Sequence, residues 1–329
     1  MLGRICLKLR NLIVGILCAV AFVGGTARAQ DPFPSRQVRV VVPFPPGSTL
    51  DALVRIVTDQ LAQKWKQPVI VENLSGGGGN IGTTRFARST PDGYTLLFAP
   101  PGPFTINPLL YGDVSYDPST FAAISLLATV PNVLVTTTKI GAETPSRLIV
   151  IAKANPNRLT YATQGVGSTA FLTAKLFEAR NGIEMVHVPY RGAGPALNDL
   201  VAGHVDMMFD TIVTSLPLHR SKKARILAVA TDKRLRVLPD IPTISESVAP
   251  GFRSVSRFAA AAPHGTPAAI VEKISRDISD LIRHPSVDAR LRELQLDPVG
   301  STPSEATNFF KEETTLWTKV IRNADVKPQ

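Results

Sequence analysis

The loop at residues 43–51, with the sequence PFPPGSTLD, constrains the fold more than any other stretch of this chain. It follows a valine-rich run at 38–42 and precedes an amphipathic segment, so we predict a strand, a tight loop and the start of a helix. The prolines stiffen the loop, and Gly47 lets it turn sharply. The first turn of a helix exposes unpaired N–H groups and the positive end of the helix dipole. The loop is therefore a candidate site for a carboxylate or a phosphate.

Residues 1–29 predict a secretory signal peptide. Basic residues precede an apolar run at 12–23, and Ala27 and Ala29 supply the small residues of a cleavage site. A membrane anchor is the alternative, but the apolar run is shorter than the ~20 residues that a membrane-spanning helix needs. We therefore expect an exported mature chain that begins at Gln30.

Both cysteines, Cys6 and Cys18, fall within the predicted signal peptide. Disulfides, zinc–thiolate sites and cysteine nucleophiles are therefore excluded from the mature chain. The formal net charge of +10 includes four basic residues of the predicted signal peptide, so the mature chain carries 10 − 4 = +6, which suits an anionic ligand without requiring one. Nucleic acid is a poor partner for this chain, because its basic residues are scattered and lack interleaved aromatics. The dense basic group at 220–225 is interpreted as a solvated loop.

The mature length of about 300 residues exceeds what one hydrophobic core usually supports, so we predict two domains. Strand and helix patterns alternate along the chain, which favours an α/β fold. We expect a first lobe from 30–132 and 255–329 and a second lobe from 133–254, joined by two crossovers that allow hinge closure. The last two long helical patterns, near 267–281 and 303–321, are expected to cover the first lobe.

Several polar residues stand at predicted helix starts or strand ends, and each has two interpretations. Ser48 and Asp51 fit the Ser-x-x-acid pattern of a helix start, so one interpretation of Asp51 is a helix cap. The functional interpretation is that Asp51 orients the loop or meets a ligand ammonium. Ser168 and Thr169 follow a second glycine-rich loop and can cap the next helix, contact a ligand, or do both. Asp210 ends a buried strand and is open to capping or ligand contact.

Four successive glycines at 76–79 form either a ligand-facing lid or a turn that needs positive φ angles. They are not followed by the Lys-Ser or Lys-Thr of a P-loop, so nucleotide binding is rejected. The five histidines show no metal-binding spacing, and no metal or cofactor is indicated. Neither Ser48 nor Ser168 lies in a Gly-x-Ser-x-Gly nucleophile elbow. No catalytic residue is predicted, and the chain is not expected to be an enzyme.

Several motifs occur in one order along the mature chain: VPFPPGSTLD at 42–51, PDGYTLL at 91–97, HVPYRG at 187–192 and LPDIPT at 238–243. Together they resemble the Bug-type periplasmic receptors, which are the substrate-binding components of tripartite tricarboxylate transporters. The resemblance covers essentially the whole mature chain. It implies a two-lobed α/β periplasmic binding protein of type II, a Venus flytrap with a hinge of two crossover strands.

The resemblance also implies a function. Such a receptor holds a small organic carboxylate between its lobes through backbone groups and small hydroxyls, and delivers it to membrane permease subunits. A monomer is expected. The alternative is a sensory protein of the same fold that presents a carboxylate to a membrane sensor kinase. The implied ligand contacts, transferred position by position, are Phe44, Gly47, Ser48, Thr49, Asp51, Pro101, Gly102, Gly167, Ser168, Thr169 and Asp210.

The chain departs from the family pattern in three respects. Ser48 stands where a second glycine is usual, and Ala-Pro-Pro at 99–101 replaces a stretch that usually supplies Ser or Thr. Ala-Phe-Leu at 170–172 stands where the family commonly has a histidine, and Arg257 where an aromatic residue is common. These changes bear on ligand identity more than on fold. We expect Ser48 and Ser168 to touch the ligand from opposite lobes.

Overall fold

The structure, a computed structural model, describes residues 33–112 and 114–323. The predicted signal peptide at 1–29 lies outside these residues. Within the described ranges, strands and helices alternate along the chain, so the α/β prediction is confirmed. No helix in that part of the chain combines the length and the apolar character of a membrane span.

The predicted strand, loop and helix around Gly47 are all present. Strand β1 (Val38–Val42) is followed by the loop and then by helix α2 (Thr49–Trp65). The buried positions of α2 recur at helical spacing, and Leu53 and Leu61 on that face are fully buried. This apolar stripe packs against the sheet and the neighbouring helices, which fixes the direction in which the start of α2 points.

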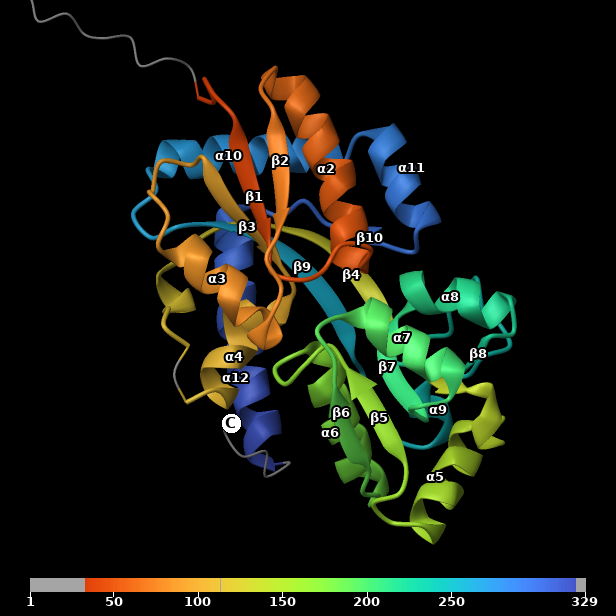
Figure 1. Cartoon of the computed structure of the whole chain (residues 1–329). Helices are drawn as coiled ribbons and strands as arrows, with labels where there is room; N and C mark the ends of the chain where they lie inside the picture. The colour runs from red at the N-terminus through yellow and green to blue at the C-terminus, as the bar shows by residue number, and fades with distance from the viewer. Residues whose placement is uncertain (1–32, 113, 324–329) are drawn as a thin grey trace, which may run out of the picture. The chain divides into compact units, whose positions relative to one another are not determined.

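The first section of the sheet combines strands from both ends of the chain (Figure 1). Its order is β2-β1-β3-β9-β4, with β2 (Val69–Asn73), β3 (Thr95–Ala99), β9 (Val255–Ala262) and β4 (Ala122–Thr137). Strand β1 pairs in parallel with β2 and β3, whereas β9 pairs antiparallel with β3 and β4. The short β10 (Asp297–Pro298) also pairs with β4.

The second section of the sheet continues from the far half of β4. Its strand order is β4-β7-β5-β6, and β8 also pairs with β4. The strands are β7 (Met207–Thr211), β5 (Thr160–Thr163), β6 (Val186–Pro189) and β8 (Ala224–Val229). Strand β4 changes partner along its length, because residues 122–131 pair with β9 and residues 132–136 with β7. The predicted lobe boundary after residue 132 falls at this change of partner, and the exact division into lobes stays a prediction.

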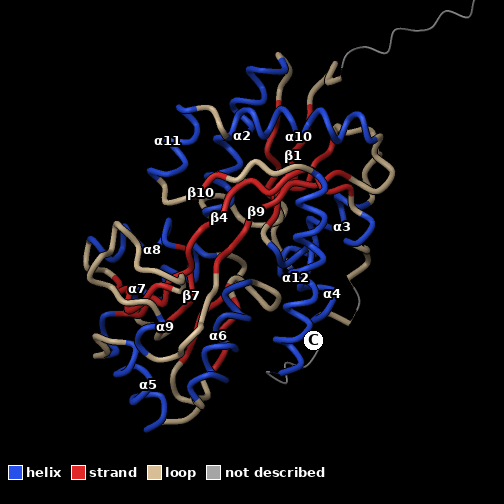
Figure 2. The backbone as a smooth tube through the Cα atoms, turned by 180° about the vertical axis from the view of Figure 1, so that it is seen from behind, coloured by secondary structure: helices blue, strands red, loops and turns tan. Residues whose placement is uncertain are grey.

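Helices flank both sections of the sheet (Figures 1 and 2). Those of the first section are α3 (Asn80–Ala87), α4 (Asn107–Leu110), α10 (Ala268–Ile282), α11 (Pro285–Glu293) and α12 (Pro303–Asn323), together with α2. Those of the second section are α5 (Pro145–Ala154), α6 (Thr169–Asn181), α7 (Ala193–Ala202), α8 (Ile212–Arg220) and α9 (Ile244–Ser247).

Helices α10 and α12 both pack on the first section, as expected, and α12 also reaches the second. Phe309 of α12 joins an apolar cluster with Phe104 of the first section, whereas Trp317 and Ile321 join a cluster with Phe171 of the second. The helix has 21 residues and, at about 1.5 Å per residue, extends past the first section. It therefore contacts β4 and the helices of both sections.

Candidate functional site: a cavity at four helix starts

A cavity of about 110 Å³ lies where four helices begin. Ser48, Ser168 and Thr211 are the N-cap residues of α2, α6 and α8, and all three line the cavity, as does Ala193 at the start of α7. These helices follow β1, β5, β7 and β6, so their loops gather at the carboxyl ends of the strands. One water molecule needs only about 10–15 Å³, so the cavity has room for a small organic molecule.

The lining of the cavity is polar on some sides and apolar on others. Its polar side chains are Ser48, Thr49, Asn132, Gln164, Ser168, Thr169, Asp210, Thr211 and Ser256. Its larger apolar side chains include Phe44, Leu50, Phe209 and Phe258. Among the described residues that line it, Asp210 alone has an ionisable side chain. In the described part of the chain, the groups of the lining that can attract an anion are therefore helix N-termini, backbone N–H groups, hydroxyls and the amide N–H groups of Asn132 and Gln164.

The structure brings together seven of the eleven predicted contact residues. Those that line the cavity are Phe44, Ser48, Thr49, Gly102, Ser168, Thr169 and Asp210. The other four, which belong to the same loops or helix starts but do not line it, are Gly47, Asp51, Pro101 and Gly167. Contact with a ligand stays a prediction for all eleven.

Sequence reasoning missed several residues that line the cavity. Thr211 directly follows Asp210 and could have been found as the N-cap of the next helix. Asn132 and Ser256 lie on β4 and β9, where no local motif marks them. Their side chains form a hydrogen bond of 3.0 Å, in which Ser256 Oγ donates to Asn132 Oδ1. These two positions become visible only once the sheet has paired.

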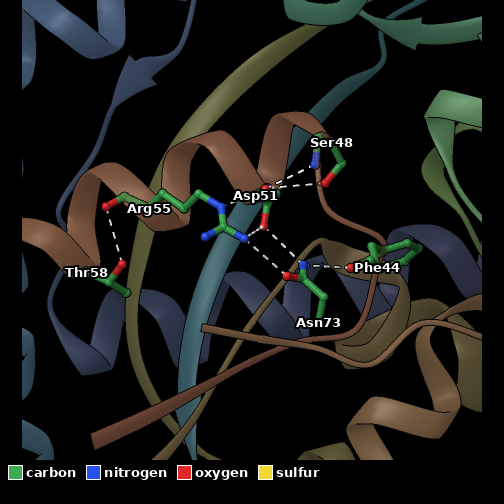
Figure 3. A network of polar contacts seen from close by, with 7 residues as sticks. Phe44, Ser48, Asp51, Arg55, Thr58 and Asn73 are labelled. Atoms are coloured by element: carbon green, nitrogen blue, oxygen red, sulfur yellow. Dashed lines mark hydrogen bonds and ion pairs between the residues drawn. The ribbon is translucent and has the colours of Figure 1, made fainter. Parts of the chain in front are cut away.

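Asp51 holds the first loop in place through the polar contacts drawn in Figure 3, and it does not line the cavity. Its Oδ2 accepts the N–H of Gly47 at 3.0 Å and the Nε of Arg55 at 2.9 Å. Its Oδ1 accepts from Asn73 Nδ2 at 3.1 Å, and the same amide donates to the carbonyl of Phe44. The geometry supports the loop-orienting interpretation of Asp51, because its carboxylate is occupied by protein donors.

The pKa of Asp51 follows from these contacts. Burial by itself would raise the pKa, but the hydrogen bonds from Arg55, Gly47 and Asn73 and the positive charge of Arg55 bring it below its usual value. The capping pattern is also present in part, since Ser48 Oγ accepts the N–H of Asp51 at 3.2 Å. In a complete capping box the Asp51 carboxylate would accept the N–H of Ser48. Here it accepts the N–H of Gly47, so the capping box is displaced by one residue.

The second loop has a different chemistry. Ser168 Oγ accepts the N–H of Phe171 at 3.2 Å and donates to the carbonyl of Gly165 at 2.7 Å, so its capping role is confirmed. Thr169 is 7 % exposed, and its Oγ1 has no hydrogen-bond partner within the described part of the chain. Thr169 thus leaves a buried hydroxyl unused at the start of α6.

The carboxylate of Asp210 contacts hydroxyls and, among the residues that the structure describes, no cation. Its Oδ2 accepts from Thr214 Oγ1 at 2.6 Å and from Ser215 Oγ at 2.7 Å. Burial raises the pKa of Asp210, and the hydrogen bonds from Thr214, Ser215 and the backbone of Thr211 offset this only in part. Asp210 is not the cap of α8, since Thr211 occupies that position, so the capping interpretation was wrong in that form.

Residues of the two sheet sections meet directly beside the cavity. Thr49 Oγ1 lies 2.6 Å from Thr211 Oγ1, and Tyr111 Oη donates to the carbonyl of Val166 at 2.6 Å. Gly78 packs so closely there that a Cβ atom would lie 2.5 Å from the carbonyl oxygen of Val166. All four glycines at 76–79 have positive φ, which confirms the turn interpretation of that loop and adds a close contact to it.

The departures from the family pattern have different structural consequences. Ser48 and Pro100 line the cavity, so they can alter what it holds. Phe171 instead packs on His187, with ring centroids 4.8 Å apart. Arg257 pairs with Glu313 at 3.4 Å and does not line the cavity. Ala170, at the start of the same 170–172 stretch, lines the cavity. The departures at Ser48, 99–101 and 170–172 therefore each place a residue in the lining of the cavity, and Arg257 does not.

The comparison with protein families agrees with this geometry. A family described as the tripartite tricarboxylate transporter family receptor matches residues 53–326. The chain belongs to this family. BugT of Bordetella pertussis is 33% identical over 317 residues, which cover 96% of this chain and 97% of that protein. The resemblance to Bug-type receptors is thereby confirmed.

Solved structures of relatives show the same fold. The R. palustris protein Rpa4515 with adipate is 36% identical and superposes with a TM-score of 0.88, over 90% of this chain and all of that chain. MatC from Rhodopseudomonas palustris with bound malate is 32% identical, with a TM-score of 0.83 over 88% of this chain and all of that chain. The predicted periplasmic-binding-protein fold is therefore confirmed for this receptor.

Proposed function

We infer that this receptor binds a small organic carboxylate in the cavity at the four helix starts and delivers it to the permease of a tripartite tricarboxylate transporter. The convergence of α2, α6, α7 and α8 on one cavity carries this proposal. Their N-termini supply N–H donors and positive dipole ends, which suit a carboxylate without a cationic side chain. The adipate and malate bound by the two relatives support the same ligand class.

The proposal also covers where the receptor acts and how it closes on its ligand. A signal peptide at 1–29 would export it to the periplasm, where lobes of residues 30–132 with 255–329 and of 133–254 would close on the ligand as a monomer. Hydrogen bonds between the two sheet sections beside the cavity, at Thr49 and Tyr111, suit such closure. No catalytic step is assigned, and the family match supports transport over the sensory alternative.

A thermal-shift screen tests the proposal. A ligand that binds only the native state must raise the melting temperature, by an amount that corresponds to about 2.7 kcal/mol when its concentration is 100 times Kd. We expect mono- and dicarboxylates of up to about six carbons to include binders, and their methyl esters to give no shift. If no carboxylate raises the melting temperature, the proposal is wrong.

A further inference from the structure

A chain of hydroxyl groups connects Asp210 to Thr49. Thr214 Oγ1 lies 2.6 Å from Asp210 Oδ2 and 3.1 Å from Thr211 Oγ1. Thr211 Oγ1 in turn lies 2.6 Å from Thr49 Oγ1. The chain begins at a buried carboxylate on β7 and ends at a cavity-lining hydroxyl on α2.

Proton counting fixes the direction of these bonds, because each threonine hydroxyl has one proton. Thr214 donates to Asp210, since this short bond to a carboxylate is stronger than its other option, a 3.3 Å contact with the carbonyl of Thr211. Thr211 must then donate to Thr214, and Thr49 must donate to Thr211. The hydroxyl of Thr49 therefore retains only lone pairs and can act toward the cavity only as an acceptor.

Thr169 can act toward the cavity as a hydrogen-bond donor. Its Oγ1 is buried without a partner among the described residues, so its proton is unused. The residue lines the cavity in the first turn of α6, where backbone N–H groups also lack helical partners. A buried hydroxyl without a partner is unfavourable, and a ligand oxygen placed here would remove that penalty. Thr169 therefore offers a donor, where Thr49 offers an acceptor.

We propose that this cavity selects carboxylates that also carry a hydrogen-bond donor, either a hydroxyl or an ammonium group. The carboxylate accepts from Thr169 and the start of α6, and the donor reaches the lone pairs of Thr49. Asp210 acts through Thr214 and Thr211 as a positioning residue that fixes the polarity of Thr49. The inference rests on the proposed function and narrows its ligand class.

The test compares acids that share a carbon skeleton and differ only in the donor. Malate and aspartate are compared with succinate, and 6-hydroxyhexanoate and 6-aminohexanoate with hexanoate, by isothermal titration calorimetry on the mature chain. We expect at least one donor-bearing acid to bind about tenfold more tightly than its partner, the effect of one well-placed hydrogen bond. Equal or tighter binding of the plain acids overturns the inference and leaves the proposed function intact.

Two variants separate the two hydroxyls. Thr49→Val removes the acceptor and should reduce the preference for the donor-bearing acid to within about twofold, whereas Thr49→Ser should restore it. Thr169→Val should weaken both acids of a pair about equally and leave their ratio unchanged. Thr58→Val is the matched control, since Thr58 is also buried on α2, 2 % exposed against 5 % for Thr49, and does not line the cavity.

Each outcome has a distinct meaning. A preference that survives Thr49→Val in a protein with an unchanged melting temperature overturns the assignment of Thr49. If Thr49→Val fails to fold, the ratio of the affinities for the donor-bearing and the plain acid is measured in Thr49→Ser and in Asp210→Asn instead. Asp210→Asn removes the carboxylate that fixes the polarity of the Thr49 hydroxyl, so an unchanged ratio in this variant overturns the assignment. Absence of binding by every acid in both sets overturns the inference and the proposed function together.

Discussion

Two buried aspartates stand near helix starts around the cavity, and their surroundings differ. Asp51 is paired with Arg55 and with backbone and amide donors, does not line the cavity, and has a lowered pKa. Asp210 has hydroxyl donors and, within the described part of the chain, no cation; it lines the cavity and has a raised pKa. The first carboxylate holds the shape of a loop, and the second is proposed to set the polarity of the hydroxyls that line the cavity.

The largest expected effect comes from neutralising each acid in turn. Asp51→Asn should lower the free energy of unfolding at pH 7 by about 2–3 kcal/mol, because a buried acceptor of three donors is replaced by a weaker one. Since the pKa of Asp51 is lowered on folding, its contribution is present above about pH 3.8 and is lost as the pH falls through the folded value. The loss should therefore shrink in acid.

Asp210→Asn should show the opposite pH dependence. The pKa of Asp210 is raised on folding, so the charged carboxylate is a penalty at neutral pH that disappears as the pH falls toward 3.8. The variant should be within about 1 kcal/mol of the wild type at pH 7, or more stable. Urea denaturation between pH 3 and 7 measures both slopes. Asp59→Asn, on the exposed face of α2, is the control, and slopes of the same sign for Asp51 and Asp210 would refute the distinction.

Local sequence patterns predicted the surroundings of Asp51 better than those of Asp210. The PFPPGSTLD motif fixed the strand, the loop and the helix, and Ser48 and Asp51 contact each other within four residues of chain. The partners of Asp210 lie in the next helix and were not anticipated, although they are close in sequence. Its connection to Thr49 passes through Thr211, which lies 162 residues from Thr49, and Ser256 reaches the cavity from a distant strand. Short-range patterns specify helix starts, whereas contacts made by strand pairing and between the two sheet sections leave no local signal.

A smaller effect is expected where the two regions touch. Gly78→Ala would place a Cβ atom 2.5 Å from the carbonyl oxygen of Val166, which forces the two loops apart. If the lobes close on the ligand as proposed, ligand affinity should fall at least about tenfold, which corresponds to about 1.4 kcal/mol. Isothermal titration with any acid identified in the thermal-shift screen measures this change.

Gly141→Ala provides the matched control for Gly78→Ala. Gly141 also has a positive φ, of 69° against 62° for Gly78, but nothing lies within 4 Å of the added Cβ atom. Both substitutions should cost about 1–2 kcal/mol of stability from the left-handed backbone. Only the Gly78 substitution should reduce affinity. Equal affinities for the two variants would show that the contact with Val166 is not part of the closed, ligand-bound form.

The last effect concerns His187, which is linked to the second loop through Thr163. His187 Nε2 lies 2.7 Å from Thr163 Oγ1, which in turn accepts the N–H of Gly165. Burial, with a contribution from the charge of Lys175, lowers the pKa of His187 to about 4. The unfolded chain therefore binds a proton that the folded chain does not between about pH 6.5 and 4, so stability should fall by about 1–2 kcal/mol as the pH falls through this window.

Two substitutions of His187 distinguish titration from packing. His187→Gln retains a polar group beside Thr163, and His187→Phe retains a ring against Tyr161 and Phe171. Neither side chain titrates, so both should remove the contribution of this group to the slope between pH 6.5 and 4, whatever each costs in packing at pH 7. Urea denaturation at fixed salt measures the slope. A slope that persists in both variants would assign the acid sensitivity to groups other than His187, and the carboxylates compared above would be the next to examine.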